Sequence, residues 1–343
     1  MVIRFAWTVT MAAEIMTVAQ LFRFTFDKEY LQQVGYPDDH LGWHTTSASP
    51  AVWVFIFLLV AGLANLLPVR QYGELEYIFG IFKVLFISGL IFFNVILSAL
   101  QLVPHGGNFW TWNKPYGFAT EKFVLQVDDN NKPVQTFGGD GGRFVALWTA
   151  ITTVMFSMIG FETIAVSGPE NKDLEKFETI KIATKKLTIR LTLLYTLATF
   201  AGGLNVPYDD PYLAQASWSS IRGGQNSLFI LAAVRNHLRG WPHFFNGFFI
   251  FSATTSGINS LYNASRLLHA LASIPEAWPL WAHGWRRRLE RTTSRGVPLA
   301  TVIVSWLFGL LAFLTIQDDS ALVCDNCAVE RKANNDVDTK SRY

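Results

Sequence analysis

The chain has 343 residues, 50% of them apolar and only 16% charged, with a formal net charge of +2. Its mean hydropathy of +0.25 is high for a soluble domain of this size, and the charge balance gives no reason to expect a nucleic-acid partner. The two cysteines, Cys324 and Cys327, exclude a disulfide scaffold. Because zinc requires about four ligands, this pair predicts neither a metal site nor a cofactor.

Apolar windows long enough to cross a bilayer recur along the chain, since a spanning helix needs about 20 such residues. Some windows are interrupted by polar or glycine positions, but they still indicate an all-α integral membrane protein with about seven transmembrane helices. The predicted spans, in chain order, are residues 5–26, 51–68, 78–103, 144–168, 187–206, 243–262 and 297–316.

Polar loops separate these windows, the longest over residues 104–143. Its glycine run at 138–142 lacks the Lys-Ser/Thr that follows a phosphate-binding loop, so a flexible connector is expected there. Residues 228–238 are too short to span and predict an amphipathic helix lying against the bundle.

The positions of lysine and arginine predict the orientation in the membrane. A lysine-rich loop follows residue 168 and an arginine-rich loop follows residue 272, and two spans separate them. Both loops are therefore expected on the cytoplasmic side, and the acidic pairs at 38–39, 128–129 and 209–210 on the outer side. The same topology places the first residue inside and the last outside.

Four ionisable residues fall within or at the edge of the predicted spans: Glu14, Lys83, Glu162 and Arg266. A charge at the centre of a membrane helix costs about 2.5–3.5 kcal/mol on insertion scales. Lys83 and Arg266 lie near span ends, where long side chains reach the interface. Glu14 lies mid-span among small residues, so it is either a polar tie between helices or a functional acid.

Glu162 is flanked by residues that weaken a helix. Gly160 precedes it by two positions, Gly168 and Pro169 follow, and Ser157 adds a hydroxyl. Broken helices occur at membrane depth where they are buried in protein or line a cavity, and their freed backbone groups can bind a ligand. The pattern predicts a ligand site, and the alternative is a glycine-tolerant helix with one buried acid.

The stretch FSMIGFETIAVSGPENKD, residues 156–173, resembles the sixth-helix signature of fungal amino-acid permeases of the amino acid–polyamine–organocation (APC) superfamily. Further segments resemble that family in the same order along the chain. They are residues 4–22 for the third helix, 69–84 for the connection between helices four and five, 205–213 for the outer loop after helix seven, 256–272 for the eighth helix, and 296–298 for the start of the ninth.

This resemblance implies an inverted-repeat (LeuT-like) transporter bundle in a multi-pass protein of the plasma membrane. It implies an amino-acid substrate and protons as partners, within the lipid bilayer. Phe156 would be an aromatic gate, and Ser157, Ile159 and Gly160 would bind the substrate. The proton-coupling or buried acids would be Glu162 and Glu14.

The resemblance covers helices three to nine, so residues 1–316 are expected to form a partial permease domain and residues 317–343 a polar, disordered tail. It implies that further helices, or a partner chain, complete the substrate site. We therefore expect little transport by the 343-residue chain alone.

Other classes of function remain as alternatives. A related permease for amines such as choline or γ-aminobutyrate would carry the same motifs. A seven-helix nutrient sensor or receptor would place the N-terminus outside. The 7 histidines are scattered and no HExxH or G-x-S-x-G spacing occurs, so the sequence predicts no enzymatic activity.

Overall fold

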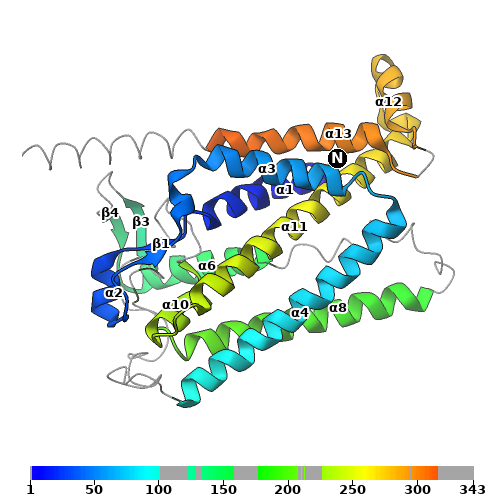
Figure 1. The fold of residues 1–343 in the computed structure, drawn as a ribbon. Coiled ribbons are helices and arrows are strands. Elements are labelled where there is room, and N and C mark those ends of the chain that lie inside the picture. Colours follow the sequence, from blue (N-terminus) through cyan, green and yellow to red (C-terminus); the bar gives the residue numbers. More distant parts are fainter. Residues whose placement is uncertain are drawn as a thin grey trace, which may run out of the picture. The chain divides into compact units, whose positions relative to one another are not determined.

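The computed structural model describes residues 2–100, 123–127, 133–157, 177–207, 210, 212, 226–293 and 296–315, and these are mainly helical (Figure 1). The chain divides into two compact units. Unit 1 comprises Met1–Ala19, Ala48–Leu66 and Ser256–Tyr343, and unit 2 comprises Gln20–Ser47 and Leu67–Thr255.

The described part of each predicted span overlaps a helix. The helices are α1 (Val2–Leu21), α3 (Pro50–Ala64), α4 (Val69–Leu100), α6 (Gly139–Ser157), α8 (Phe177–Gly203), α11 (Trp241–Ala272) and α13 (Leu299–Phe308), which continues as a 3-10 helix, η6 (Gly309–Thr315). The first span was predicted too long, because the chain leaves the helix after Leu21 and forms strand β1 at Thr25–Phe26.

Only α4, among the described helices, is both long and apolar enough to cross a membrane by length and composition. Three shorter apolar helices cover Phe5–Leu21, Pro50–Ala64 and Leu299–Leu314. The predicted number of about seven spans is therefore not confirmed by these helices. The apolar side chains that α4 leaves exposed, including Phe82, Leu85 and Phe92, are what a lipid-facing helix requires.

Unit 1 packs α1, α3, the C-terminal part of α11, and η6 around a core that includes Met11, Ile15, Leu58 and Leu261. Helix α3 begins at a sequence signal: the Ser49 side chain accepts a hydrogen bond from the Ala51 amide at 3.3 Å, and Pro50 stands at the first helical position. Helices α3 and α13 run alongside each other (Figure 1).

The contact between α3 and α13 depends on one glycine. The Trp306 indole N–H donates to the Leu58 carbonyl at 2.8 Å, and its ring lies against Gly62. A Cβ at Gly62 would lie 2.9 Å from the indole nitrogen, so a larger residue would push the two helices apart.

Unit 2 packs α4 against α8, with a polar contact near the end of α8. The side-chain amide of Asn205 donates to the Asn94 carbonyl at 2.8 Å, and Asn94 is itself fully buried. Polar side chains bonded in this way join helices where hydrophobic packing alone is weak.

A small module of unit 2 lies between α1 and α3 in the sequence. Strand β1 pairs antiparallel with β2 (Leu41–Gly42), and α2 (Lys28–Val34) lies between them. Helix α2 ends at Gly35, which adopts the left-handed conformation (φ 77°) that favours glycine.

Helix α10 (Leu228–Arg235) corrects the prediction that residues 228–238 form an amphipathic helix lying against the bundle. Five consecutive residues, Ile230–Val234, are fully buried in the core of unit 2. Five successive positions cover more than a full turn, so α10 is enclosed on all sides. Its apolar composition, with two alanines that permit close approach, explains the difference.

The connector over 104–143 is also more regular than expected. Its described parts contain strands β3 (Phe123–Val127) and β4 (Pro133–Phe137), which form an antiparallel pair. The glycine run at 138–142, expected as a flexible connector, instead enters the first turn of α6, which starts at Gly139.

Candidate functional site

The predicted substrate stretch begins at the C-terminal end of α6. Phe156 and Ser157 are the last two described residues of that helix, and their side chains lie outside the described part of the structure. Ile159, Gly160 and Glu162 also lie outside the described residues. The grouping of these residues around a substrate therefore stays a prediction.

Glu14 lies within unit 1, on α1, where α1 meets α11. The Ser256 hydroxyl donates to the Glu14 carboxylate at 2.9 Å, and Glu14 is half-buried. The next residue on α11, Gly257, brings the helices close: a Cβ there would lie 3.2 Å from the Ile15 side chain. The structure thus contains a polar contact between helices at Glu14, which is one of the two alternatives predicted for this residue.

More polar groups of α11 in unit 1 lie near α3. The Asn65 side-chain amide, just after α3, donates to the Ile258 carbonyl at 3.1 Å and to the Ala61 carbonyl at 2.9 Å. Ser260 and Asn263 are buried on the same helix. Together with the Glu14–Ser256 contact, these residues give α11 a polar stripe within an apolar unit. Charge and polarity inside a membrane bundle are costly and mark functional or helix-joining positions.

A second polar cluster, in unit 2, was not predicted from the sequence. Asp210 is buried, and its carboxylate accepts hydrogen bonds from the Tyr30 hydroxyl at 3.0 Å and the Arg235 guanidinium at 2.8 Å. The Tyr212 amide donates to the same carboxylate at 3.1 Å. The outer-loop cluster, defined as Asp27, Tyr30, Asp210, Tyr212 and Arg235, therefore joins α2, α10 and the segment after α8.

Tyr212 ties this cluster to the start of α2. Its hydroxyl donates to the Asp27 carboxylate at 2.8 Å and accepts from the Asp27 amide at 3.0 Å. Burial, reinforced by the neighbouring carboxylates Asp210 and Asp27, raises the pKa of Tyr30 and of Tyr212 well above the usual 10.0. Both tyrosines therefore remain protonated donors at physiological pH. The sequence carried only one hint, the acidic and aromatic run NVPYDDPYL.

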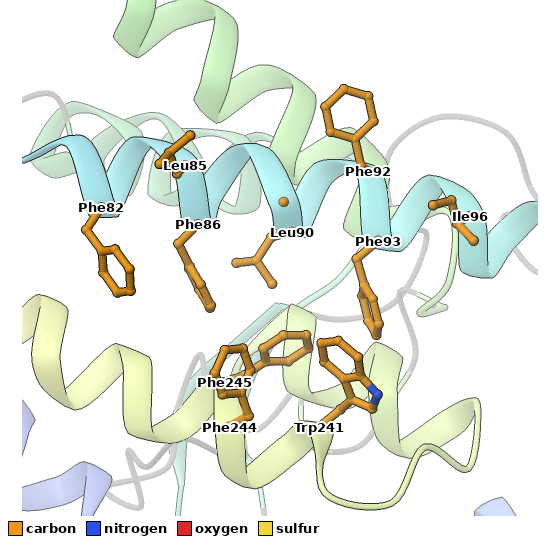
Figure 2. A pocket seen from close by; sticks show the side chains of 11 residues that line it. Phe82, Leu85, Phe86, Leu90, Phe92, Phe93, Ile96, Trp241, Phe244 and Phe245 are labelled. Atoms are coloured by element: carbon orange, nitrogen blue, oxygen red, sulfur yellow. The ribbon is translucent and has the colours of Figure 1, made fainter.

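An apolar groove of about 480 Å³ also lies in unit 2, between α4 and the start of α11 (Figure 2). Phe86, Phe93 and Phe245 point into it, while the indole nitrogen of Trp241 points away. The lining offers no charged group. An amino acid carries an ammonium and a carboxylate, each of which needs a polar partner when buried, so this groove does not suit such a ligand.

The described residues contain no group of three or more His, Cys, Asp or Glu side chains able to hold a metal ion. Helices with apolar outer faces and polar contacts between them are the features of a helical membrane protein.

Comparison with known proteins identifies the family. Residues 3–325 match the amino acid permease family, and the chain belongs to that family of integral membrane proteins.

Three relatives illustrate the similarity. A lysine/arginine permease of Candida albicans is 27% identical over 313 residues, which are 90% of this chain and 46% of that protein. The histidine permease of Saccharomyces cerevisiae is 30% identical over 284 residues, 82% of this chain and 42% of that protein. A proline-specific permease of Emericella nidulans is 29% identical over 276 residues, which are 80% of this chain and 46% of that protein.

The chain thus spans about half the length of the curated relatives it matches. No solved structure matches it.

Proposed function

We propose that the protein containing this chain transports amino acids across a membrane. The observation that carries the proposal is the family match over residues 3–325, almost the whole chain. The related permeases are named for lysine and arginine, for histidine and for proline, so the shared substrate class is the amino acid. The particular amino acid is left open, because these relatives differ in it at similar identity.

The proposed architecture is an APC-type inverted-repeat bundle in which residues 1–316 supply helices three to nine and residues 317–343 form a polar tail. Helices beyond this chain, in the same product or a partner, would complete the bundle. The plasma membrane is the proposed location, with the arginine-rich loop after residue 272 in the cytoplasm. The outer-loop cluster supports this topology, since it joins segments that the orientation rule assigns to one side.

The proposed substrate residues are Phe156, Ser157, Ile159 and Gly160. A helix that stops within the membrane leaves unpaired carbonyls, which can bind a substrate's ammonium group. The glycines and the proline around Glu162 in the sequence, Gly160, Gly168 and Pro169, support such a break here.

Proton coupling is proposed for Glu162, with Glu14 as a second acid. Glu14 supports such a role in one respect: its hydrogen bond from Ser256 comes from a neutral hydroxyl. A hydroxyl can donate to a carboxylate or accept from a carboxylic acid, so this contact persists in either protonation state.

Uptake of labelled amino acids tests the function. The native product that contains this chain is expressed in yeast lacking its own amino-acid permeases, beside the 343-residue chain alone and an empty vector. We expect uptake of at least one amino acid by the native product, increased by an inward proton gradient, and little uptake by the chain alone. A native product that reaches the membrane and transports choline or γ-aminobutyrate, but no amino acid, would support the amine permease instead.

A further inference from the structure

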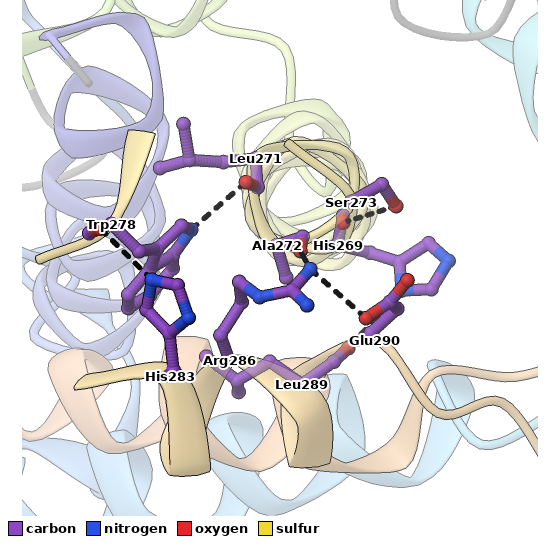
Figure 3. Close-up of polar contacts among 9 residues, drawn as sticks. All are labelled: His269, Leu271, Ala272, Ser273, Trp278, His283, Arg286, Leu289 and Glu290. Atoms are coloured by element: carbon purple, nitrogen blue, oxygen red, sulfur yellow. Dashed lines mark hydrogen bonds and ion pairs between the residues drawn. The ribbon is translucent and has the colours of Figure 1, made fainter. Parts of the chain in front are cut away.

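The segment between α11 and α13 is held firmly against the end of α11 in unit 1 (Figure 3). The Trp278 indole N–H donates to the Leu271 carbonyl at 2.9 Å, and the Arg286 guanidinium donates to the Ala272 carbonyl at 3.0 Å. These carbonyls belong to the last turn of α11, where the backbone C=O groups have no N–H donors within the helix. A cation at a helix C-terminus is also favoured by the helix dipole.

Helix α12 (His283–Leu289) is fixed by a second set of contacts. Leu289 is buried together with Leu268 and Ala272, and its carbonyl is in hydrogen-bond contact with the His269 ring at 3.1 Å. Helix α12 also packs against α13. The segment is therefore positioned at the end of α11 and the start of α13, two helices that the proposed topology places in the membrane, where the protein would meet the lipid headgroups.

Three arginines of this segment are exposed: Arg287, Arg288 and Arg291. Within the described residues, none of the three forms an ion pair with a carboxylate. The neighbouring acid, Glu290, is engaged by Arg286 at 3.1 Å. The segment thus presents a group of positive charges that no described carboxylate neutralises, while Arg286 has a separate, structural role.

Two tryptophans are exposed beside these arginines. Trp281 is 84% exposed and Trp285 is 64% exposed. Exposed indoles are unfavourable in water but are enriched at membrane–water interfaces, where the ring contacts acyl chains and the N–H faces the headgroups. Exposed arginines and tryptophans within one short segment therefore match a surface that is both anionic and partly apolar.

We propose that Trp281, Trp285, Arg287, Arg288 and Arg291 form an interfacial anchor that binds anionic phospholipids of the bilayer in which the protein sits. The arginines contact headgroup phosphates and carboxylates, and the two indoles insert at the headgroup level. Basic clusters next to a membrane helix bind acidic lipids in this way. A soluble acidic protein would satisfy the arginines, but it would leave the two indoles without their apolar contact.

Bromolipid quenching tests the anchor. The full chain is reconstituted into phosphatidylcholine vesicles in which a minor fraction of the lipid is dibrominated phosphatidylserine or, in parallel, dibrominated phosphatidylcholine. Bromine quenches tryptophan fluorescence only at contact. The difference in quenching between the wild type and the variant Trp281→Phe/Trp285→Phe reports on these two side chains.

We expect the two tryptophans to be quenched more strongly by brominated phosphatidylserine than by brominated phosphatidylcholine. The triple variant Arg287→Gln/Arg288→Gln/Arg291→Gln should lower the relative affinity for phosphatidylserine by at least about fivefold, with a smaller effect at high salt. Neither variant touches Trp278 or Arg286, so the docking of the segment is preserved.

A matched control removes three positive charges that already have carboxylate partners. Lys28 lies 3.0 Å from Asp39, Arg239 lies 3.0 Å from Asp38, and Arg143 lies 3.2 Å from Asp140. Changing these three cations to glutamine should leave the lipid preference unchanged.

Three results would overturn the proposal. One is equal quenching of the two tryptophans by both bromolipids. Another is a loss of preference for phosphatidylserine in the control variant that equals the loss in the triple arginine variant. The third is a change in their fluorescence on adding a soluble polyanion such as heparin, with no quenching by either bromolipid. That third result would point to a soluble acidic partner.

Discussion

Removing the Asp210 carboxylate should strongly destabilise unit 2. Asp210→Ala leaves the buried Tyr30 hydroxyl and the Arg235 guanidinium without the acceptor that they share. Breaking a buried ion pair by deleting one partner costs about 3–5 kcal/mol. The lower value applies, because the Arg235 side chain is 20% exposed and water can partly replace the lost contact. At about 2 °C or more per kcal/mol, the melting temperature should fall by about 6 °C.

The assay is fluorescence-detected size-exclusion chromatography of the tagged chain after heating in mild detergent. Asp39→Ala is the matched control, because Asp39 pairs with Lys28 while their side chains are 73% and 61% exposed. An exposed pair contributes at most about 1 kcal/mol. Asp210→Asn keeps a hydrogen-bond acceptor, so its melting temperature should lie between those of Asp210→Ala and Asp39→Ala. Equal melting temperatures for Asp210→Ala and Asp39→Ala would show that the outer-loop cluster does not stabilise the unit.

Three further changes follow from the packing. Gly309→Ala should destabilise the chain by about 1–3 kcal/mol, because the new methyl group would overlap buried side chains of unit 1. The methyl group of Gly89→Ala meets open space, so this variant should be neutral or stabilising by up to about 1 kcal/mol. Comparing the melting temperatures of the two variants checks both values. Alkaline pH should destabilise unit 2. Because the pKa values of Tyr30 and Tyr212 are raised, the contribution of these tyrosines to the free energy of unfolding is complete below pH 10.0 and is lost as the pH rises above it. In unfolding curves measured over a pH series, Tyr30→Phe should lose less stability at alkaline pH than the wild type. Asn205→Ala removes the amide that bonds the backbone of α4 and should cost about 0.6–1.7 kcal/mol by the same heating assay, and an unchanged midpoint would count against that bond.

The sequence predicted the positions of the helices well, because about 20 apolar residues in a row admit little else in a membrane protein. It was wrong where local context decides. The apolar window 5–26 predicted a longer span, but β1 pairs with β2 from Thr25. Residues 228–238 predicted an amphipathic helix lying against the bundle, but the two alanines of α10 let its neighbours enclose it.

The sites differ in how far the sequence could predict them. The stretch 156–162 carries its own local signal, an acid beside glycines, and Glu14 stood out as a charge in an apolar window. The partner of Glu14, Ser256, is 242 positions away, and no local pattern links them. The outer-loop cluster likewise joins Tyr30 to Asp210 across 180 positions. Such pairs arise from the packing of distant helices, which a single sequence does not encode locally.

Uptake by the native product with Gly160→Val, compared with the wild type and with Gly89→Ala, tests the central claim most directly. All three proteins should reach the membrane in equal amounts, as measured by a fluorescent tag. We predict that Gly160→Val abolishes amino-acid uptake, because a branched side chain would prevent the substrate from reaching the backbone, while Gly89→Ala retains it. Uptake by Gly160→Val equal to the wild type would place the substrate elsewhere, and no amino-acid uptake by a correctly inserted wild type would contradict the transport function itself.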